Sequence, residues 1–180
     1  MVKYQLVTTL DILEEFEGRL IIDWGSATRS WHQKGTTNKK IVAIQSNQKR
    51  IFEGFENLIL SFQELKEIIE DSVVYDSWHT ALSAVYAIYL ITDLVNGKQY
   101  VGSAYGEKGL LGRWSIYIKT GHGNNKKIGE AICQYPDRYE HFQFSVLQIL
   151  PKNITEEDII KIENLWKNKL QTRKFGMNDN

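Results

Sequence analysis

Four side chains in the second half of the chain suit chemistry on a phosphodiester: Tyr89, Tyr100, Arg113 and Glu163. Hydrolysis of such a bond needs a base for the attacking water, positive charge beside the phosphate and stabilisation of the leaving oxygen. Tyrosine has a pKa of about 10 and acts as a base only where nearby positive charge lowers that pKa. Arg113 supplies such a charge, and its planar guanidinium also suits a phosphate. The tyrosine and arginine side chains are therefore candidates for proton transfer and phosphate binding.

Each of these side chains also has a purely structural interpretation. Two tyrosines on paired strands usually pack at the edge of a core, and an arginine on a helix is usually a surface charge. Glu163 lies between Ile162 and Leu165 in an apolar helical stretch, where a lone carboxylate is usually solvated. Its functional alternative is to hold a cation, and one Mg²⁺ that keeps most of its waters, or Mn²⁺, is the natural ligand.

The two tyrosines require a hairpin that brings them together. An apolar segment from Val85 to Ile91 is followed by Asn96-Gly97 and by a second segment, Lys98–Ser103. Asn-Gly between apolar segments indicates a tight turn whose two central residues both have positive φ. The sequence therefore predicts two antiparallel strands with a tyrosine on each.

The remaining elements of this half are predicted from periodicity. Residues 110–118 and 126–133 have helical spacing, and residues 142–150 alternate like a strand. Acidic residues after Thr155 suit a helix N-terminus, and the apolar face of that helix is predicted to contain Ile159, Ile162, Leu165, Trp166 and Leu170. The order predicts an α/β (α+β) domain over residues 84–180, in which helices flank a three-stranded antiparallel sheet.

The types, order and spacing of these residues resemble the GIY-YIG nuclease family. Ala87-Ile88-Tyr89 and Tyr100-Val101-Gly102 occupy the positions of the two tripeptides that name it, and the resemblance covers about residues 84–180. Intron-homing enzymes of phages have the most similar pattern, followed by restriction-type members. The site residues that the resemblance implies are Tyr89, Tyr100, Arg113, Tyr117, His122, Glu163 and Asn178.

The resemblance implies a metal-dependent DNA endonuclease of the restriction or mobile-element type. Tyr89 is then the general base with Tyr100 beside it, although the two roles are exchangeable. Arg113 and His122 contact the phosphate, Glu163 holds the metal ion and Asn178 braces the site. Two positions depart from the family pattern: Ala87 replaces the usual glycine, and Ser103 stands where some relatives have a lysine that lowers the tyrosine pKa.

Residues 1–83 are predicted to form a smaller, mixed α/β N-terminal domain that selects the DNA target. We expect a helix over Leu10–Phe16, strands at Leu20–Trp24 and Lys40–Ile44, and a helix that Ser61 and Glu64 cap. The stretch 29–50 contains no acidic residue, which is typical either of a DNA-contacting segment or of a solvated loop. The candidate DNA contacts of the whole chain are Trp31, Lys34, Lys39, Lys40, Lys119, Lys126, Lys127, Arg173 and Lys174.

Composition narrows the alternatives. The net charge is zero, so bulk electrostatics alone would not hold the chain on nucleic acid. Cys133 is the single cysteine, which excludes an internal disulfide and a multi-cysteine zinc site. The absence of a long apolar segment favours a cytoplasmic protein without a membrane partner. A non-catalytic nucleic-acid-binding or partner-binding protein on a nuclease-derived fold is the alternative function.

Overall fold

The computed structural model describes residues 16, 19–25, 36, 38–44 and 51–179. The chain divides into two compact units, Met1–Lys49 and Arg50–Asn180. The expected boundary at residue 83 therefore lies inside the second unit. The reason is physical: Leu60, Leu65 and Leu82 are completely buried in the same core as the hairpin residue Tyr89.

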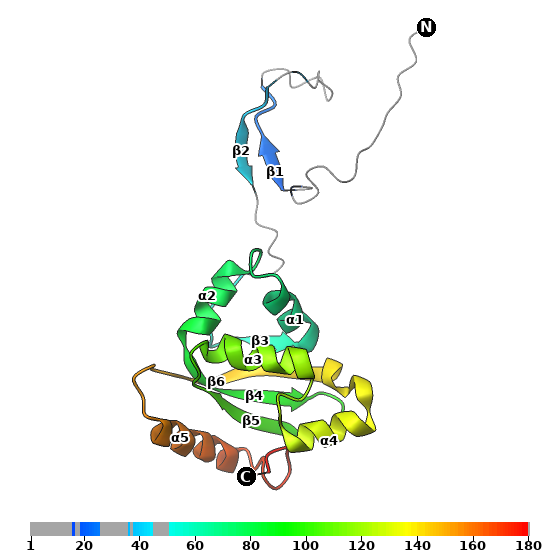
Figure 1. Ribbon diagram of the computed structural model, residues 1–180, viewed down its shortest axis with the longest axis vertical. Coiled ribbons are helices and arrows are strands. Elements are labelled where there is room, and N and C mark those ends of the chain that lie inside the picture. The colour runs from blue at the N-terminus through cyan, green and yellow to red at the C-terminus, as the bar shows by residue number, and fades with distance from the viewer. Residues whose placement is uncertain (1–15, 17–18, 26–35, 37, 45–50, 180) are drawn as a thin grey trace. The chain divides into compact units, whose positions relative to one another are not determined.

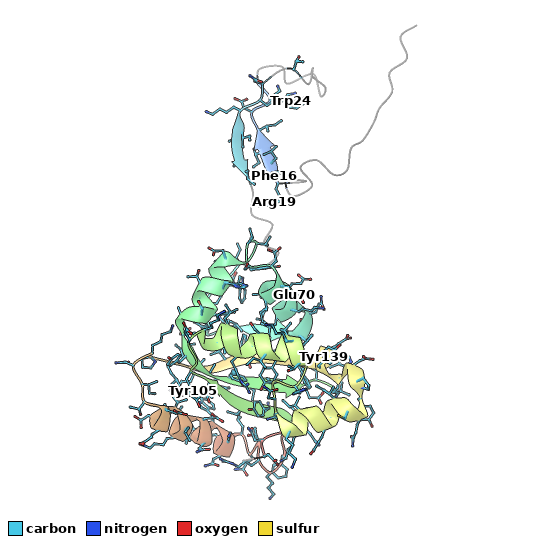
Figure 2. The ribbon with its side chains drawn as sticks, in the orientation of Figure 1. Phe16, Arg19, Trp24, Glu70, Tyr105 and Tyr139 are labelled. Atoms are coloured by element: carbon cyan, nitrogen blue, oxygen red, sulfur yellow. The ribbon has the colours of Figure 1, made fainter. Side chains whose placement is uncertain are left out.

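The described part of the first unit contains a two-stranded antiparallel sheet, β1 (Leu20–Ile22) and β2 (Ile41–Ile44). Both strands lie where the sequence predicts them. Trp24, labelled in Figure 2, accepts a hydrogen bond on its backbone oxygen from Lys39 Nζ at 3.1 Å, and the same ammonium lies 4.7 Å from the Trp24 ring centroid. Most of the expected helix over Leu10–Phe16 lies outside the described residues, as do Trp31 and Lys34.

The second unit contains a four-stranded sheet in the order β3-β6-β4-β5, with every neighbouring pair antiparallel (Figure 1). Its strands are β3 (Ile59–Ser61), β4 (Tyr86–Asp93), β5 (Gln99–Ala104) and β6 (Phe142–Leu150). The three predicted strands are thus confirmed. Strand β3 is a fourth strand that was not predicted, and its residues were expected in the other domain. The α/β class with an antiparallel sheet is also confirmed.

The β4–β5 turn differs from the predicted two-residue turn. Gly97 has a positive φ of 73°, but Asn96 does not. The turn is longer than expected: Asp93 N–H donates to the Lys98 carbonyl, and Gly97 N–H donates to the Asp93 carbonyl. The Asp93 and Asn96 side chains accept from the backbone N–H groups of Val95 and Lys98. Side-chain hydrogen bonds therefore stabilise a wider turn in which only the glycine needs the left-handed conformation.

Helices cover both faces of this sheet. Those of the second unit are α1 (Phe62–Glu70), α2 (Asp76–Ala84), α3 (Gly109–Thr120), α4 (Lys126–Gln134), a 3-10 helix (Pro136–His141) and α5 (Glu156–Lys169). The capping box predicted from Ser61 and Glu64 is present at the start of α1, and Thr155 caps α5. In the described chain, no helix has the length and apolar character needed to cross a membrane.

Alternation along β4 separates two cores. Tyr89 and Ile91 pack on the face that carries α1, α2 and α3. Ile88 packs with Val101 on the opposite face, which α5 covers (Figure 1). The helix α5 contributes Ile159 to this second core, as expected, but Leu165 is 51% exposed. Its predicted place on the apolar face is wrong. The residue that α5 buries instead is Lys167, which is 4% exposed.

Candidate active site

Tyr89 lies at the centre of the hairpin and is completely buried. Its hydroxyl lies 3.2 Å from the Tyr117 hydroxyl and accepts a hydrogen bond from Arg113 Nε at 2.9 Å. Arg113 and Tyr117 are four residues apart on α3, which places both side chains on the helix face toward β4. Tyr100 on β5 completes the group, with its ring centroid 6.4 Å from that of Tyr89.

The electrostatics of the buried tyrosines differ from the sequence expectation. Burial raises the pKa of Tyr89, a negative charge on Tyr100 would raise it further, and Arg113 opposes both effects without overcoming them. Burial also raises the pKa of Tyr117 well above its ordinary value. Both phenols are therefore protonated at neutral pH, and an arginine beside a buried tyrosine is insufficient to make it acidic.

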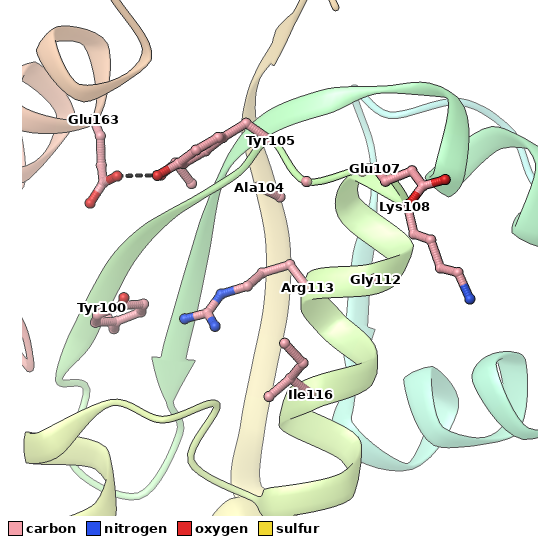
Figure 3. A pocket seen from close by; sticks show the side chains of 12 residues that line it. Tyr100, Ala104, Tyr105, Glu107, Lys108, Gly112, Arg113, Ile116 and Glu163 are labelled. Atoms are coloured by element: carbon pink, nitrogen blue, oxygen red, sulfur yellow. Dashed lines mark hydrogen bonds between the residues drawn. The ribbon is translucent and has the colours of Figure 1, made fainter. Parts of the chain in front are cut away.

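Arg113 connects this buried group to an open pocket. Its guanidinium is half-buried, stacks 5.0 Å from the Tyr117 ring centroid and extends from α3 toward Tyr100 (Figure 3). The pocket has a volume of about 630 Å³ and lies beside the edge strand β5, between α3 and α5. It is lined by Tyr100, Ser103, Ala104, Tyr105, Gly106, Glu107, Lys108, Gly109, Gly112, Arg113, Ile116 and Glu163.

Glu163 faces this pocket from α5. Its Oε1 atom lies 2.7 Å from Lys167 Nζ, and its Oε2 atom accepts a hydrogen bond from Ser103 Oγ, which the dashed line in Figure 3 marks. Among the described residues, no cluster of three or more His, Cys, Asp and Glu side chains is arranged to hold a metal ion. A carboxylate with unused lone pairs on a pocket wall nevertheless fits one Mg²⁺ or Mn²⁺ that keeps most of its waters.

Asn178 is 1% exposed and bonds to the free edge of β5. Its Oδ1 atom accepts from Val101 N–H at 2.9 Å, and its Nδ2 atom donates to the Val101 carbonyl at 2.8 Å. The side-chain amide thus replaces a neighbouring strand, one residue away from Tyr100 and two from Ser103. This position agrees with a bracing role rather than contact with a substrate.

His122 lies apart from this arrangement. Its Nδ1 atom accepts a hydrogen bond from Asn124 N–H at 3.0 Å within the loop that follows α3. The lining of the described pocket includes neither His122 nor Tyr117. The structure therefore brings Tyr89, Tyr100, Arg113 and Tyr117 together, places Glu163 across the pocket, and leaves His122 outside it.

Comparison with known proteins shows the family to which this chain belongs. A sequence model of the GIY-YIG catalytic domain matches residues 85–178, which is more than half of the chain. The chain belongs to the GIY-YIG family. It carries a GIY-YIG-type endonuclease domain, and the matched segment contains every second-unit residue that the sequence resemblance assigned to the site.

Two solved structures are similar to this chain. One is a mutant catalytic domain of the intron endonuclease I-TevI, with 25% identity, a TM-score of 0.43, and coverage of 53% of this chain and 94% of that one. The other is the catalytic domain of the homing endonuclease I-TevI, with 29% identity, a TM-score of 0.40, and coverage of 52% and 96%. No curated protein matches the chain.

The basic residues of the GIY-YIG domain that are predicted to contact DNA differ in how they interact with the rest of the protein. Lys119 is exposed at the end of α3. Lys126 and Lys127 lie 4.0 and 3.6 Å from the Asp179 carboxylate, and Lys127 also donates to the Asn178 carbonyl at 2.6 Å. Arg173 and Lys174 follow α5 and are both exposed; Arg173 donates to the side chains of Asn164 and Asn168.

Sequence analysis assigned no role in the site to three residues that contribute to it. Ser103 was considered only because some relatives have a lysine at this position, yet its hydroxyl donates a hydrogen bond to the Glu163 carboxylate. Gly102 lies so close to Tyr89 that a Cβ atom there would overlap the tyrosine hydroxyl. Nothing in the sequence around Lys167 indicates that it is buried. Its spacing of four residues from Glu163, however, could have predicted an ion pair on one helix face.

Proposed function

We propose that the chain hydrolyses DNA phosphodiester bonds with the help of a divalent cation. The observation that carries this proposal is the position of Arg113, which touches the buried tyrosines on one side and lines a pocket that contains Glu163 on the other. A phosphate in this pocket would meet the guanidinium, a phenol and a carboxylate, which are the three kinds of group that the reaction needs. The GIY-YIG family match supports this over a non-catalytic function.

Geometry favours exchanging the roles of the two hairpin tyrosines. A general base must reach the proton that it removes, and Tyr100 lines the pocket whereas Tyr89 is completely buried with a raised pKa. In this proposal Tyr100 as a phenolate accepts the proton of the attacking water and becomes a neutral phenol, with the Arg113 guanidinium in the same pocket. Tyr89 holds the guanidinium in place through its hydroxyl.

The remaining groups act on the phosphate. Arg113 binds a nonbridging oxygen and orients the phosphate for in-line attack by the water. Glu163 would hold Mg²⁺ or Mn²⁺, whose charge would stabilise the leaving oxygen. Ser103 and Lys167 fix the orientation of the Glu163 carboxylate. His122, which lies outside the pocket, has no part in this mechanism.

The biological setting and the target surface are further proposals. A restriction or mobile-element role suits a chain in which a second unit precedes the nuclease domain. Lys40 is exposed in that first unit and suits a phosphate contact, whereas Lys39 is already engaged with Trp24. On the nuclease domain, the exposed cations Lys119, Arg173 and Lys174 suit contact with the DNA backbone.

Cleavage of supercoiled plasmid tests the proposed function. With Mg²⁺ or Mn²⁺ we expect conversion of the plasmid to nicked or linear forms, and with chelator we expect no conversion. A mixture of plasmids and oligonucleotide duplexes of varied sequence widens the range of target sequences that the assay covers. Cleavage that proceeds equally in chelator would contradict the proposed cation dependence.

Phenylalanine substitutions distinguish the two tyrosines. Tyr100→Phe should lower the cleavage rate on the order of a hundredfold, the usual contribution of a general base, without changing the melting temperature. Tyr89→Phe removes a buried hydroxyl that is hydrogen-bonded to Tyr117 and Arg113. The free energy of unfolding of this variant should therefore fall by about 1 kcal/mol. Native cleavage by Tyr100→Phe, with activity lost only in Tyr89→Phe, would restore Tyr89 as the base.

A further inference from the structure

Lys167 is a buried cation next to the proposed cation ligand. Only 5% of its side chain is exposed, and its Nζ atom lies 2.7 Å from Glu163 Oε1. The exposed pair Lys161 and Asp158 on the same helix has side-chain exposures of 72% and 51%. A buried charged pair loses far more hydration than an exposed one, which makes the burial of Lys167 costly in free energy.

The geometry of the pair has two effects on Glu163. First, Lys167 holds Oε1 while Ser103 donates to Oε2, so each oxygen of the carboxylate is held by its own partner. Second, the ammonium offsets the negative charge that would attract a divalent cation. The charged side chains that line the pocket balance one another, because Arg113 and Lys108 are matched by Glu163 and Glu107, and Lys167 beside Glu163 adds one positive charge.

We propose that Lys167 is a positioning residue that orients Glu163 and offsets its charge, so that the DNA-free protein binds divalent cations weakly and acquires them together with a DNA phosphate. This inference rests on the proposed role of Glu163. The DNA phosphate supplies the negative charge that the Lys167–Glu163 pair lacks, and Arg113 in the same pocket helps to recruit that phosphate. Cation binding and substrate binding are therefore coupled.

Binding of Mn²⁺ to DNA-free protein, measured by electron paramagnetic resonance, tests the inference without a cleavage assay. Lys167→Met removes the ammonium and keeps an unbranched side chain, and it should bind Mn²⁺ on the order of tenfold more tightly than the native protein. Lys167→Arg keeps the charge and should bind Mn²⁺ as the native protein does. Lys161→Met is the matched control, since it removes an exposed lysine from the same helix.

Glu163→Gln combined with Lys167→Met identifies the site, because the gain in Mn²⁺ affinity must disappear when the carboxylate is removed. If Lys167→Met gains no affinity, or gains no more than Lys161→Met, the inference is overturned. This outcome is distinct from failure of the proposed function, which plasmid cleavage decides.

The native protein provides a second measurement in case Lys167→Met does not fold. Mn²⁺ affinity should rise at least on the order of tenfold when a duplex with non-cleavable phosphorothioate linkages is bound, and Glu163→Gln on the same duplex corrects for Mn²⁺ bound by DNA alone. Equal affinity with and without the duplex would also overturn the inference.

Discussion

Glu163→Ala is expected to lower DNA cleavage on the order of a thousandfold while leaving DNA binding largely intact. The carboxylate is the group proposed to hold the cation, and loss of comparable charge stabilisation usually costs two to three orders of magnitude, roughly 10²–10³. The same change leaves Lys167 buried without its carboxylate, so the free energy of unfolding should fall by about 3 kcal/mol. Single-turnover rates and thermal melts separate the two effects.

Glu107→Ala is the matched control for this change. Glu107 also lines the pocket, but no catalytic role is assigned to it, and it should retain cleavage within a few-fold of the native rate. Both variants carry the same change of charge. If Glu163→Ala cuts DNA at the native rate, or if Glu107→Ala loses as much activity, the assignment of the cation ligand is wrong.

Gly102→Ala should lower both stability and cleavage, although it adds only one methyl group. A Cβ atom at this position would overlap the Tyr89 hydroxyl and lie 2.8 Å from Tyr100 Cε1. Either the strands or the tyrosine rings must move, and such overpacking costs about 1–3 kcal/mol of stability. Because Tyr89 also holds Arg113, we expect cleavage to fall on the order of a hundredfold in rate assays below the melting temperature.

Gly129→Ala tests whether this effect is specific to the site. Gly129 lies in α4, and a Cβ atom there meets nothing within 4 Å. Alanine is a better helix former than glycine by about 1 kcal/mol, so this variant should melt at the native temperature or slightly above it and cleave normally. Native cleavage by Gly102→Ala would show that the close approach of β4 and β5 does not constrain the site.

Local sequence patterns predicted most of the nuclease domain. The strand over residues 142–150 was predicted with its observed bounds, and the helix after Thr155 begins at Glu156, where the acidic residues indicated an N-terminus. Such elements have strong signals because alternation and capping depend on near neighbours in the chain. Strand β3 was not predicted as part of this sheet because its pairing with β6 joins residues more than eighty positions apart.

Sequence analysis selected candidate site residues but predicted their surroundings less well. The resemblance selected Tyr89, Arg113 and Glu163 as candidates, and the structure brings the first two into direct hydrogen-bond contact. It also reverses the expected direction of the Tyr89 pKa, because the cost of burying a phenolate depends on packing from several elements. The burial of Lys167 depends in the same way on how α5 meets the sheet.

The last residues of the domain have a consequence for solubility. Strand β5 is at the edge of the sheet, where unpaired backbone groups can pair with strands of other molecules. Met177 N–H donates to the Gln99 carbonyl, and the Asn178 side chain bonds to both backbone groups of Val101. These two residues therefore occupy backbone groups of β5 that could otherwise pair with a strand of another molecule. This protection against intermolecular β-sheet growth is independent of any contribution to catalysis.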